Sequence, residues 1–506
     1  MKAIYKFLFT LSMMLVTHWT SGCSSTVSGE VTSSPDKPSQ ILDTEWDDRS
    51  IFKAGLISAE QEILNNLPGA SVYHIDFKIS DDFLTLSGWE EVHYTNREEI
   101  PLNEVYFQLF PNAAGGKTTI VSLAVDGHEI EPIYEFLDSA LLVSLSTPLE
   151  PGASSDIRMV FEVDVAREME GNYGLFGYFD DVLVLDEFYP VIPVYDDEGW
   201  NVQAPPPNAD TSYFDTSFYL VQVTAPADLI IAASGIEVEN SKAGDSQVVV
   251  FAAGPVRDFY LAASEKFIIT SQVVGETVVN NYVMKGQEKG AKLALQFTKN
   301  SLESFKKRFG AYPYTEFDVL GAPMQALGIE YPGIVGVVAA AYNQGEVISG
   351  LPFPAMLESV IAHEVAHQWF YNIVGNDQID EPWLDEAMAQ YSTLLYYIDT
   401  YGKSGAQSFR DSWDYRWERI ERAEIPIGLP AAAYKGPEYS GIIYGRGPIF
   451  VEALASEMGK EAFAAFLKDY YKTHKWNIAT SDSFKETSES NCKCDLTPLF
   501  ETWVFP

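Results

Sequence analysis

A pair of histidines on either side of a glutamate is the sequence feature with the clearest chemistry. His363-Glu364-Val365-Ala366-His367 spaces two imidazoles four residues apart, in a segment with helical apolar periodicity. Four residues advance a helix by little more than one turn, so both imidazoles can bind one Zn²⁺ ion. Glu364 can then take a proton from water whose pKa the ion lowers. The alternative is a chance match on a buried helix, which the use here of two of only seven histidines weakens.

A third ligand for such an ion is Glu386, in the run WLDEAMAQY that starts at Trp383. This run is expected to begin the next helix, and helices joined by a short loop pack as neighbours, so the carboxylate can approach both imidazoles. Three protein ligands leave the fourth zinc position open to water, as in catalytic zinc sites. Acids are also favoured at a helix start by the helix dipole, and we assign that solvated role to Asp380, Glu381 and Asp385.

The spacing of HEVAHQWF and WLDEAMAQY resembles that of the gluzincin aminopeptidases of the aminopeptidase N and leukotriene hydrolase family. Upstream, Gly328-Ile329-Glu330-Tyr331-Pro332 is similar to the family's Gly-x-Met-Glu-Asn strand. The resemblance implies that Glu330 binds the free α-amine of a peptide and that Gly328 lets the peptide approach closely. Ile329 replaces the family's Met and Tyr331 its Asn, so we expect a differently shaped first specificity pocket.

A fourth motif agrees with the same family. Tyr444-Gly445-Arg446-Gly447 resembles the family's Tyr-x-basic-Gly, whose tyrosine stabilises the oxyanion. Other nearby tyrosines lack the basic residue and the glycine at these offsets. The resemblance therefore implies one Zn²⁺ ion held by both histidines and the following glutamate, with Glu364 as the base and Tyr444 as the oxyanion donor.

The segments that must position these residues fall into two kinds. Between about residues 73 and 282, short β-branched and aromatic runs alternate with Gly, Pro, Asn and Asp, which predicts an all-β domain. Residues 189–215 contain five prolines and predict a long loop or irregular insert. Apolar periodicity then predicts helices over residues 289–309, 354–370, 382–401, 448–458, 461–474 and 481–488.

The expected fold class is therefore α+β and multidomain. An N-terminal all-β domain, saddle-like in the family, precedes a mostly helical, thermolysin-like zinc peptidase domain. We place the β domain at residues 46–283 and the catalytic domain at residues 284–506. The three histidines of the β domain are expected to be ordinary polar or loop residues.

The first residues predict export. Lys2 and Lys6 precede an apolar run over residues 7–16, which is shorter than the about 20 residues that span a bilayer. The run TSGC ending at Cys23 resembles a bacterial lipobox, in which the cysteine becomes the lipidated N-terminus. We favour lipidation of Cys23; secretion with an incidental thiol is the alternative, because threonine stands where a lipobox usually has leucine.

These signals define two further segments and a location. Residues 1–22 are the expected signal peptide, and residues 23–45, rich in Ser, Thr and Pro, are the expected flexible tether. The protein is expected to be exported and anchored by lipid on the extracytoplasmic side of a membrane, or otherwise secreted. The sequence does not indicate an oligomeric state.

Composition excludes several classes of protein. Among 506 residues, 72 acidic side chains outnumber 33 basic ones, and the net charge of -39 argues against a nucleic-acid partner. A hydrophobic content of 46% argues against a disordered chain. Three cysteines cannot form a disulfide framework, although Cys492 and Cys494 could form one isolated bridge.

The expected substrates are peptides with a free N-terminus, cleaved by attack of a metal-activated water. Two alternatives stay open at this stage. One is a zinc endopeptidase with the same site, and the other is a non-enzymatic surface lipoprotein that binds partners through its β domain. Epoxide hydrolysis, which occurs in some family members, has no assignable residue here.

Overall fold

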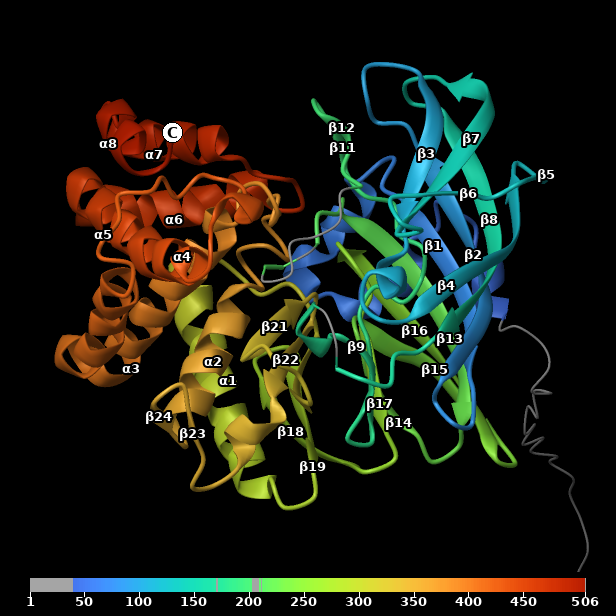
Figure 1. The fold of residues 1–506 in the computed structure, drawn as a ribbon, viewed down its shortest axis with the longest axis horizontal. Coiled ribbons are helices and arrows are strands. Elements are labelled where there is room, and N and C mark those ends of the chain that lie inside the picture. Colours follow the sequence, from blue (N-terminus) through green and yellow to red (C-terminus); the bar gives the residue numbers. More distant parts are fainter. Residues whose placement is uncertain (1–39, 170–171, 203–208, 211, 506) are drawn as a thin grey trace, which may run out of the picture. The chain divides into compact units, whose positions relative to one another are not determined.

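The computed structural model describes residues 40–169, 172–202, 209–210 and 212–505. Most of its strands lie before residue 285, coloured from blue to yellow-green, and its α-helices lie after that residue, coloured from yellow-green to red (Figure 1). The described residues include no helix that combines the length and the apolar character needed to cross a membrane. Cys23 lies outside the described residues.

An eight-stranded sheet forms the largest element of the β region. Strand β8 alternates buried and solvent-facing residues, with Ile157, Met159, Phe161 and Val163 buried, whereas β13 is buried on both faces over most of its length. Only β1 and β13 pair in parallel. The strands, in spatial order, are β15 (Ile236–Ala243), β16 (Ser246–Val256), β13 (Ser217–Pro226), β1 (Val72–Ile79), β2 (Thr85–Thr95), β8 (Ser154–Asp164), β4 (Lys117–Val125) and β5 (His128–Ile130).

Smaller sheets complete this region. One has three strands, β3 (Leu102–Gln108), β7 (Ala140–Leu149) and β6 (Ile133–Glu135). Another has four, β14 (Ile230–Ala233), β17 (Leu261–Ser264), β10 (Val182–Leu185) and β9 (Phe176–Phe179). Within the predicted irregular insert, the described residues form one short hairpin, β11 (Tyr195–Asp196) and β12 (Gly199–Trp200).

A five-stranded sheet crosses the predicted domain boundary. It consists of β18 (Phe267–Val274), β19 (Thr277–Met284), β20 (Glu316–Ala322), β22 (Ile334–Val338) and the edge strand β21 (Gly328–Tyr331). Because β19 pairs in parallel with β20, strands on both sides of residue 283 belong to one sheet. A boundary at that residue stays a prediction, and the edge strand β21 carries the predicted amine-binding residue.

Six of the described helices overlap the predicted segments, two short helices were not predicted, and three of the six end several residues from the predicted point. The bounds are α1 (Glu288–Arg308), α2 (Ala355–Ala366), α3 (Trp383–Glu418), α4 (Glu438–Gly441), α5 (Gly447–Met458), α6 (Lys460–His474), α7 (Ser481–Cys492) and α8 (Thr497–Trp503), and a short hairpin pairs β23 (Val347–Ile348) with β24 (Leu351–Pro352). The helix expected to reach residue 370 ends at Ala366. The helix expected to stop at Gly402 is only interrupted there (φ 72°, ψ 171°) and resumes, because glycine adopts a conformation that other residues avoid.

The β region and the helical region share one buried core. Arg257, at the end of β16, illustrates the connection. Its buried guanidinium donates hydrogen bonds to the carbonyl groups of Phe214, Tyr371, Ile373 and Asn477. It therefore ties the segment after α2 to the β region. The predicted fold class, an all-β region followed by a mostly helical domain, is confirmed.

Candidate active site

The two histidines of the motif lie at the end of α2 with their ring nitrogens together. The apolar stripe of α2 is buried, including Leu357, Ile361 and Val365 at 0% exposure, which fixes the orientation of the helix. His367 follows the last helical residue but keeps helical backbone angles, so the one-turn spacing is preserved. The Nε2 atoms of His363 and His367 lie 3.2 Å apart.

Glu386 enters this pair from the first turn of α3. Its Oε2 lies 3.1 Å from Nε2 of His363 and 3.6 Å from Nε2 of His367. Burial opposes ionisation of this carboxyl group, but bonds from both imidazoles hold its pKa well below the ordinary value. The predicted third ligand is therefore in contact with the other two.

The donor set fits one zinc ion. One ligand atom from each of His363, His367 and Glu386 lies within 4.8 Å of the others, and among the described residues the two imidazoles are the only donor groups beside the buried Oε2 of Glu386. Two imidazoles and one carboxylate are the ligands of many catalytic zinc sites. The negative charge around these ligands also suits a cation. Burial lowers the pKa of the His367 imidazole, but the surrounding carboxylates outweigh this effect and raise that pKa well above its ordinary value.

A second group of residues contacts His367 at Nδ1, the ring nitrogen that does not face Glu386. Its Nδ1 lies 3.2 Å from the carbonyl oxygen of Phe370, and Glu330 and Asp385 lie 3.7 and 4.0 Å away. Gln378 joins the two acids, because its amide nitrogen lies 2.8 Å from an oxygen of each. These contacts place both acids beside the imidazole, with Gln378 as a bridge between them, and acids are common beside metal-binding histidines.

Asp385 corrects one expectation. It was expected to be a solvated helix-start acid, but it is 1% exposed and accepts hydrogen bonds from Asn376 and Gln378. Position at a helix start predicts solvent exposure only when no other segment covers that turn. Here the segment between α2 and α3 folds over it. Neither Asn376 nor Gln378 carries a spacing signal that could have identified it from sequence.

Glu330 lies where the resemblance requires, on β21 beside the metal-ligand group. Its side chain is buried, and burial raises the pKa of its carboxyl group, an effect that His367 opposes. Ile329 lies on the opposite face of this strand, because neighbouring strand residues alternate, and it is buried in an apolar cluster with Met324 and Ile334. Contact between Ile329 and a substrate stays a prediction.

Glu364 and Gly328 are close neighbours. Glu364 is 4% exposed, and its carboxyl group has no hydrogen-bond partner among the described residues. A Cβ atom on Gly328 would overlap that carboxyl group. Gly328 therefore makes room for the predicted base, in addition to the expected approach of a peptide. Burial and the charge of Glu330 raise the pKa of Glu364 well above its ordinary value.

Tyr444 completes the group from a π-helical turn, Ile442–Arg446. Its hydroxyl donates a hydrogen bond to Oε1 of Glu386, and its ring centroid lies 6.1 Å from that of His363. Gly445 allows this turn to approach α3, since a Cβ atom there would lie 3.0 Å from backbone atoms of Trp413 and Trp417. The wider turn of a π-helix is typical of functional positions.

The basic residue of the same motif has a structural role. Nη1 of Arg446 donates to the carbonyl oxygens of Ile425 and Trp503 at 2.9 and 2.8 Å, and Nη2 donates to that of Thr502 at 3.0 Å. The guanidinium also lies 4.5 Å from the ring centroid of Trp503. Arg446 therefore holds the turn that carries Tyr444 against the last helix, α8.

Two other predicted features lie away from this group. Cys492 and Cys494 form a disulfide with a Cα–Cα distance of 5.2 Å, so the bridge left open from sequence is present. Of the β-domain histidines, His93 pairs with Asp156 at 2.6 Å and His74 is buried. His93 is a polar residue of β2, as expected, whereas His74 is a core residue of β1 and not a loop residue.

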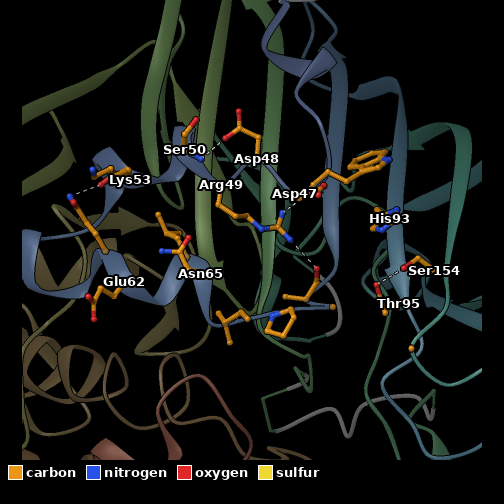
Figure 2. Close-up of a pocket in the computed structure, with 18 of the residues that line it drawn as sticks. Asp47, Asp48, Arg49, Ser50, Lys53, Glu62, Asn65, His93, Thr95 and Ser154 are labelled. Atoms are coloured by element: carbon orange, nitrogen blue, oxygen red, sulfur yellow. Dashed lines mark hydrogen bonds between the residues drawn. The ribbon is translucent and has the colours of Figure 1, made fainter.

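A hollow of about 980 Å³ lies at the start of the β region and contains none of the predicted catalytic residues. Figure 2 shows Arg49 at its centre, bonded to the backbone of Trp46 and Ala70, with Asp48 bonded to Ser50 nearby. The charged groups of this hollow are thus partly engaged with the protein itself. The chemistry of the predicted site is not found there.

The part of the chain that carries the site is similar to a known family of peptidases. The family model described as the Peptidase family M1 domain matches residues 293–503. These residues include α2, α3 and the turn carrying Tyr444. The resemblance predicted from the four motifs is thereby confirmed.

Individual relatives agree with this match. "Aminopeptidase M1" of Arabidopsis thaliana is 24% identical over 295 residues, covering 56% of this chain and 34% of that protein. "Aminopeptidase 2" of Candida albicans is 22% identical over 479 residues, covering 89% of this chain and 48% of that protein. This chain thus spans less than half the length of these two relatives.

The fold is similar to that of a solved structure of comparable extent. The M1 zinc metallopeptidase from Deinococcus radiodurans superposes with a TM-score of 0.66 at 20% identity, covering 86% of this chain and 93% of that one. A mutant of the Deinococcus protein has been solved bound to a Tyr-Ser-Ala substrate, with a TM-score of 0.66. These similarities show that the two-domain arrangement recurs in a zinc peptidase.

Proposed function

We propose that this protein is a zinc aminopeptidase that removes N-terminal residues from peptides. The observation that carries the proposal is the convergence of His363, His367 and Glu386 on one point, with Glu364 and Tyr444 beside it. A zinc ion held by these three residues would supply a Lewis acid, which polarises a carbonyl group and lowers the pKa of water towards about 7. All other roles belong to side chains of the protein.

Each of these side chains has one role in the proposed reaction. The Glu364 carboxylate accepts a proton from the attacking water and later returns it to the leaving amine. The Tyr444 hydroxyl donates a hydrogen bond to the carbonyl oxygen as that oxygen gains negative charge. The burial of Glu364 supports its proposed role as the proton acceptor. A buried carboxylate without hydrogen-bond donors beside it accepts a proton more strongly than a solvated carboxylate does.

Glu330 is proposed to select peptides with a free N-terminus. Its carboxylate lies on the edge strand beside the metal-ligand group, where it can pair with an ammonium group. A charge-assisted bond of this kind contributes about 1.5 to 3 kcal/mol and fixes the chain end relative to the scissile bond. The similarity to proteins named as aminopeptidases and the tripeptide bound to the Deinococcus mutant support this substrate class.

The protein is also proposed to be exported and anchored by a lipid on Cys23. The support is the order of Lys2, Lys6 and the apolar run before Cys23. In a bacterial host, membrane fractionation with and without the substitution Cys23→Ser tests this part. Retention of the wild type and release of the variant are expected. Equal release of both proteins would leave secretion as the explanation.

Three measurements test the activity. Wild-type protein should hydrolyse an alanyl arylamide, and a chelator should abolish this reaction until zinc is restored. Glu364→Gln should keep one zinc per chain and lose about 10²- to 10⁴-fold in kcat, because it removes the proton acceptor. An N-acetylated peptide should resist cleavage. Cleavage of that peptide would indicate an endopeptidase, and a protein with neither zinc nor activity would indicate a binding lipoprotein.

A further inference from the structure

The second half of α3 brings an arginine to the active site. Along an unbroken helix, Arg416 would lie roughly 45 Å from Glu386, at 1.5 Å per residue. The break at Gly402 changes the direction of the chain. As a result, the guanidinium carbon of Arg416 lies 5.5 Å from the ring centroid of Tyr444, within electrostatic range of Glu386 and His363.

Arg416 differs from the other arginines that are not exposed. Arg49, Arg257, Arg308, Arg410 and Arg446 all bind carboxylates or backbone carbonyl groups. The guanidinium of Arg416 is half-buried, yet it has no hydrogen bond or ion pair with any described residue. Among the described residues, its guanidinium group lies only against the aromatic face of Tyr444, so none of them accepts a hydrogen bond from its five N–H groups.

The position of Arg416 relative to the proposed amine site indicates which part of a bound peptide it would contact. Glu330 contacts the site on the Nδ1 side of His367. Tyr444 and Arg416 lie on the side of His363. The carboxylate expected to bind the N-terminal amine and the free guanidinium thus flank the metal-ligand group on different sides. A peptide whose amine lies at Glu330 would extend its leaving part away from that residue.

We propose that Arg416 binds a carboxylate on the leaving-group side of the scissile peptide bond. This inference rests on the proposed aminopeptidase function and adds a preference to it. The carboxylate can be the C-terminus of a dipeptide or an acidic side chain at the residue after the cleaved bond. A protein of net charge -39 repels anionic peptides overall, so local recognition of a carboxylate needs a cation at the site.

Four substrates distinguish the two sources of the carboxylate. Ala-Ala is compared with Ala-Ala amide, and Ala-Asp amide with Ala-Asn amide, so that each pair differs by one charge. Wild-type protein should show kcat/KM about 10- to 100-fold higher for the charged member of at least one pair, the range of one charge-assisted bond. The pair that responds identifies the source.

Three variants test whether Arg416 is responsible. Arg416→Gln should bring that ratio close to one, and Arg416→Lys should give an intermediate ratio, because an ammonium keeps the charge without the planar fork. Arg419→Gln removes an exposed charge about one turn further on, just after the end of α3, and should change the ratio less than about threefold. This variant is the matched control for a general effect of charge.

The possible outcomes separate this inference from the proposed function. If wild-type protein hydrolyses none of the four peptides, the aminopeptidase function is wrong. If it hydrolyses all four with equal kcat/KM, or if Arg416→Gln keeps the wild-type ratio, the function stands and the role of Arg416 is wrong. Equal losses in Arg416→Gln and Arg419→Gln would also contradict direct contact.

Discussion

The hydroxyl group of Tyr444 donates a hydrogen bond to Oε1 of Glu386, while Oε2 of the same carboxylate faces both imidazoles. One side chain therefore connects the proposed oxyanion donor to the metal-ligand group. This arrangement requires the π-helical turn, α2 and α3 to be fixed relative to one another. A small displacement of any of them would separate the phenol from the position where it can act.

Removal of the Tyr444 hydroxyl should affect catalysis more than binding. Tyr444→Phe is expected to lower kcat for an alanyl arylamide by about 10²- to 10³-fold, the usual cost of losing one oxyanion donor, with a much smaller change in KM. Tyr439→Phe is the matched control, because the Tyr439 hydroxyl is buried without a partner among the described residues. Its loss should change kcat less than about threefold. Equal effects of both variants would argue against the assignment.

The space that Gly328 leaves for the Glu364 carboxyl group should be as important for catalysis as that carboxyl group itself. Gly328→Ala would push the Glu364 carboxyl group from its place, and a misplacement of about 1 Å can lower kcat about 10²-fold. Gly336→Ala, on the neighbouring strand β22, would instead press on the apolar ends of Met324 and Ile329. Steady-state kinetics and zinc content should therefore distinguish the two variants. Both are expected to keep zinc, and only Gly328→Ala is expected to show a lower kcat. A zinc-free Gly328→Ala protein would contradict this explanation.

The sequence predicts the parts of the site that lie within one helical turn or one motif. His363 and His367 share a face because of helical periodicity, and Glu386 begins the next helix. Asp385 and Gln378 could not be found in this way, since their burial depends on how the segment between α2 and α3 folds over the helix start. Arg416 depends on a change of direction at Gly402 that a helical pattern does not reveal.

The same limit applies to the larger elements. Alternation and turn residues predict β strands before residue 284, and apolar periodicity predicts the starts of six helices to within one residue. It misses the short helices α4 and α8 and the continuation of α3 beyond Gly402. Strand pairing across residue 283 is not predicted, because β19 joins β20 through contacts between segments separated by a whole helix, α1. Pairing partners depend on tertiary packing, which local composition does not specify.

Arg446 should contribute to stability rather than to recognition of substrate. Arg446→Lys would leave backbone carbonyl groups near α8 without donors, and we expect the free energy of unfolding to fall by about 3 kcal/mol in urea titrations. Arg422→Lys changes an exposed arginine paired with Asp414 and Glu418, so its effect should stay below about 1 kcal/mol. Equal stability of the two variants would contradict the structural role of Arg446.

Stability should depend on pH through the buried acid Asp258. Burial, supported by the charge of Glu330 and opposed by Arg257, raises the pKa of its carboxyl group from 3.8 to about 7. The folded state therefore holds a proton that the unfolded state releases, and the free energy of unfolding should decrease between about pH 4 and pH 7. A shift of this size corresponds to at most about 4 kcal/mol.

Asp258→Asn removes this titration and tests the prediction. Urea unfolding of chelator-treated protein at pH 5 and pH 8 should show that wild type loses more stability with rising pH than the variant does. Removal of metal excludes any effect of pH on metal binding. If the free energies of unfolding of wild type and variant differ by the same amount at pH 5 and at pH 8, Asp258 does not titrate in this range.

The central claim is that one zinc ion is bound by His363, His367 and Glu386, and anomalous diffraction at the zinc edge tests it most directly. Crystals of the zinc-loaded wild type should give one strong anomalous peak bonded to Nε2 of both histidines and to a carboxylate oxygen of Glu386. Glu386→Gln should weaken or abolish this peak. A peak at any other group of residues, or none in wild-type crystals, would contradict the account.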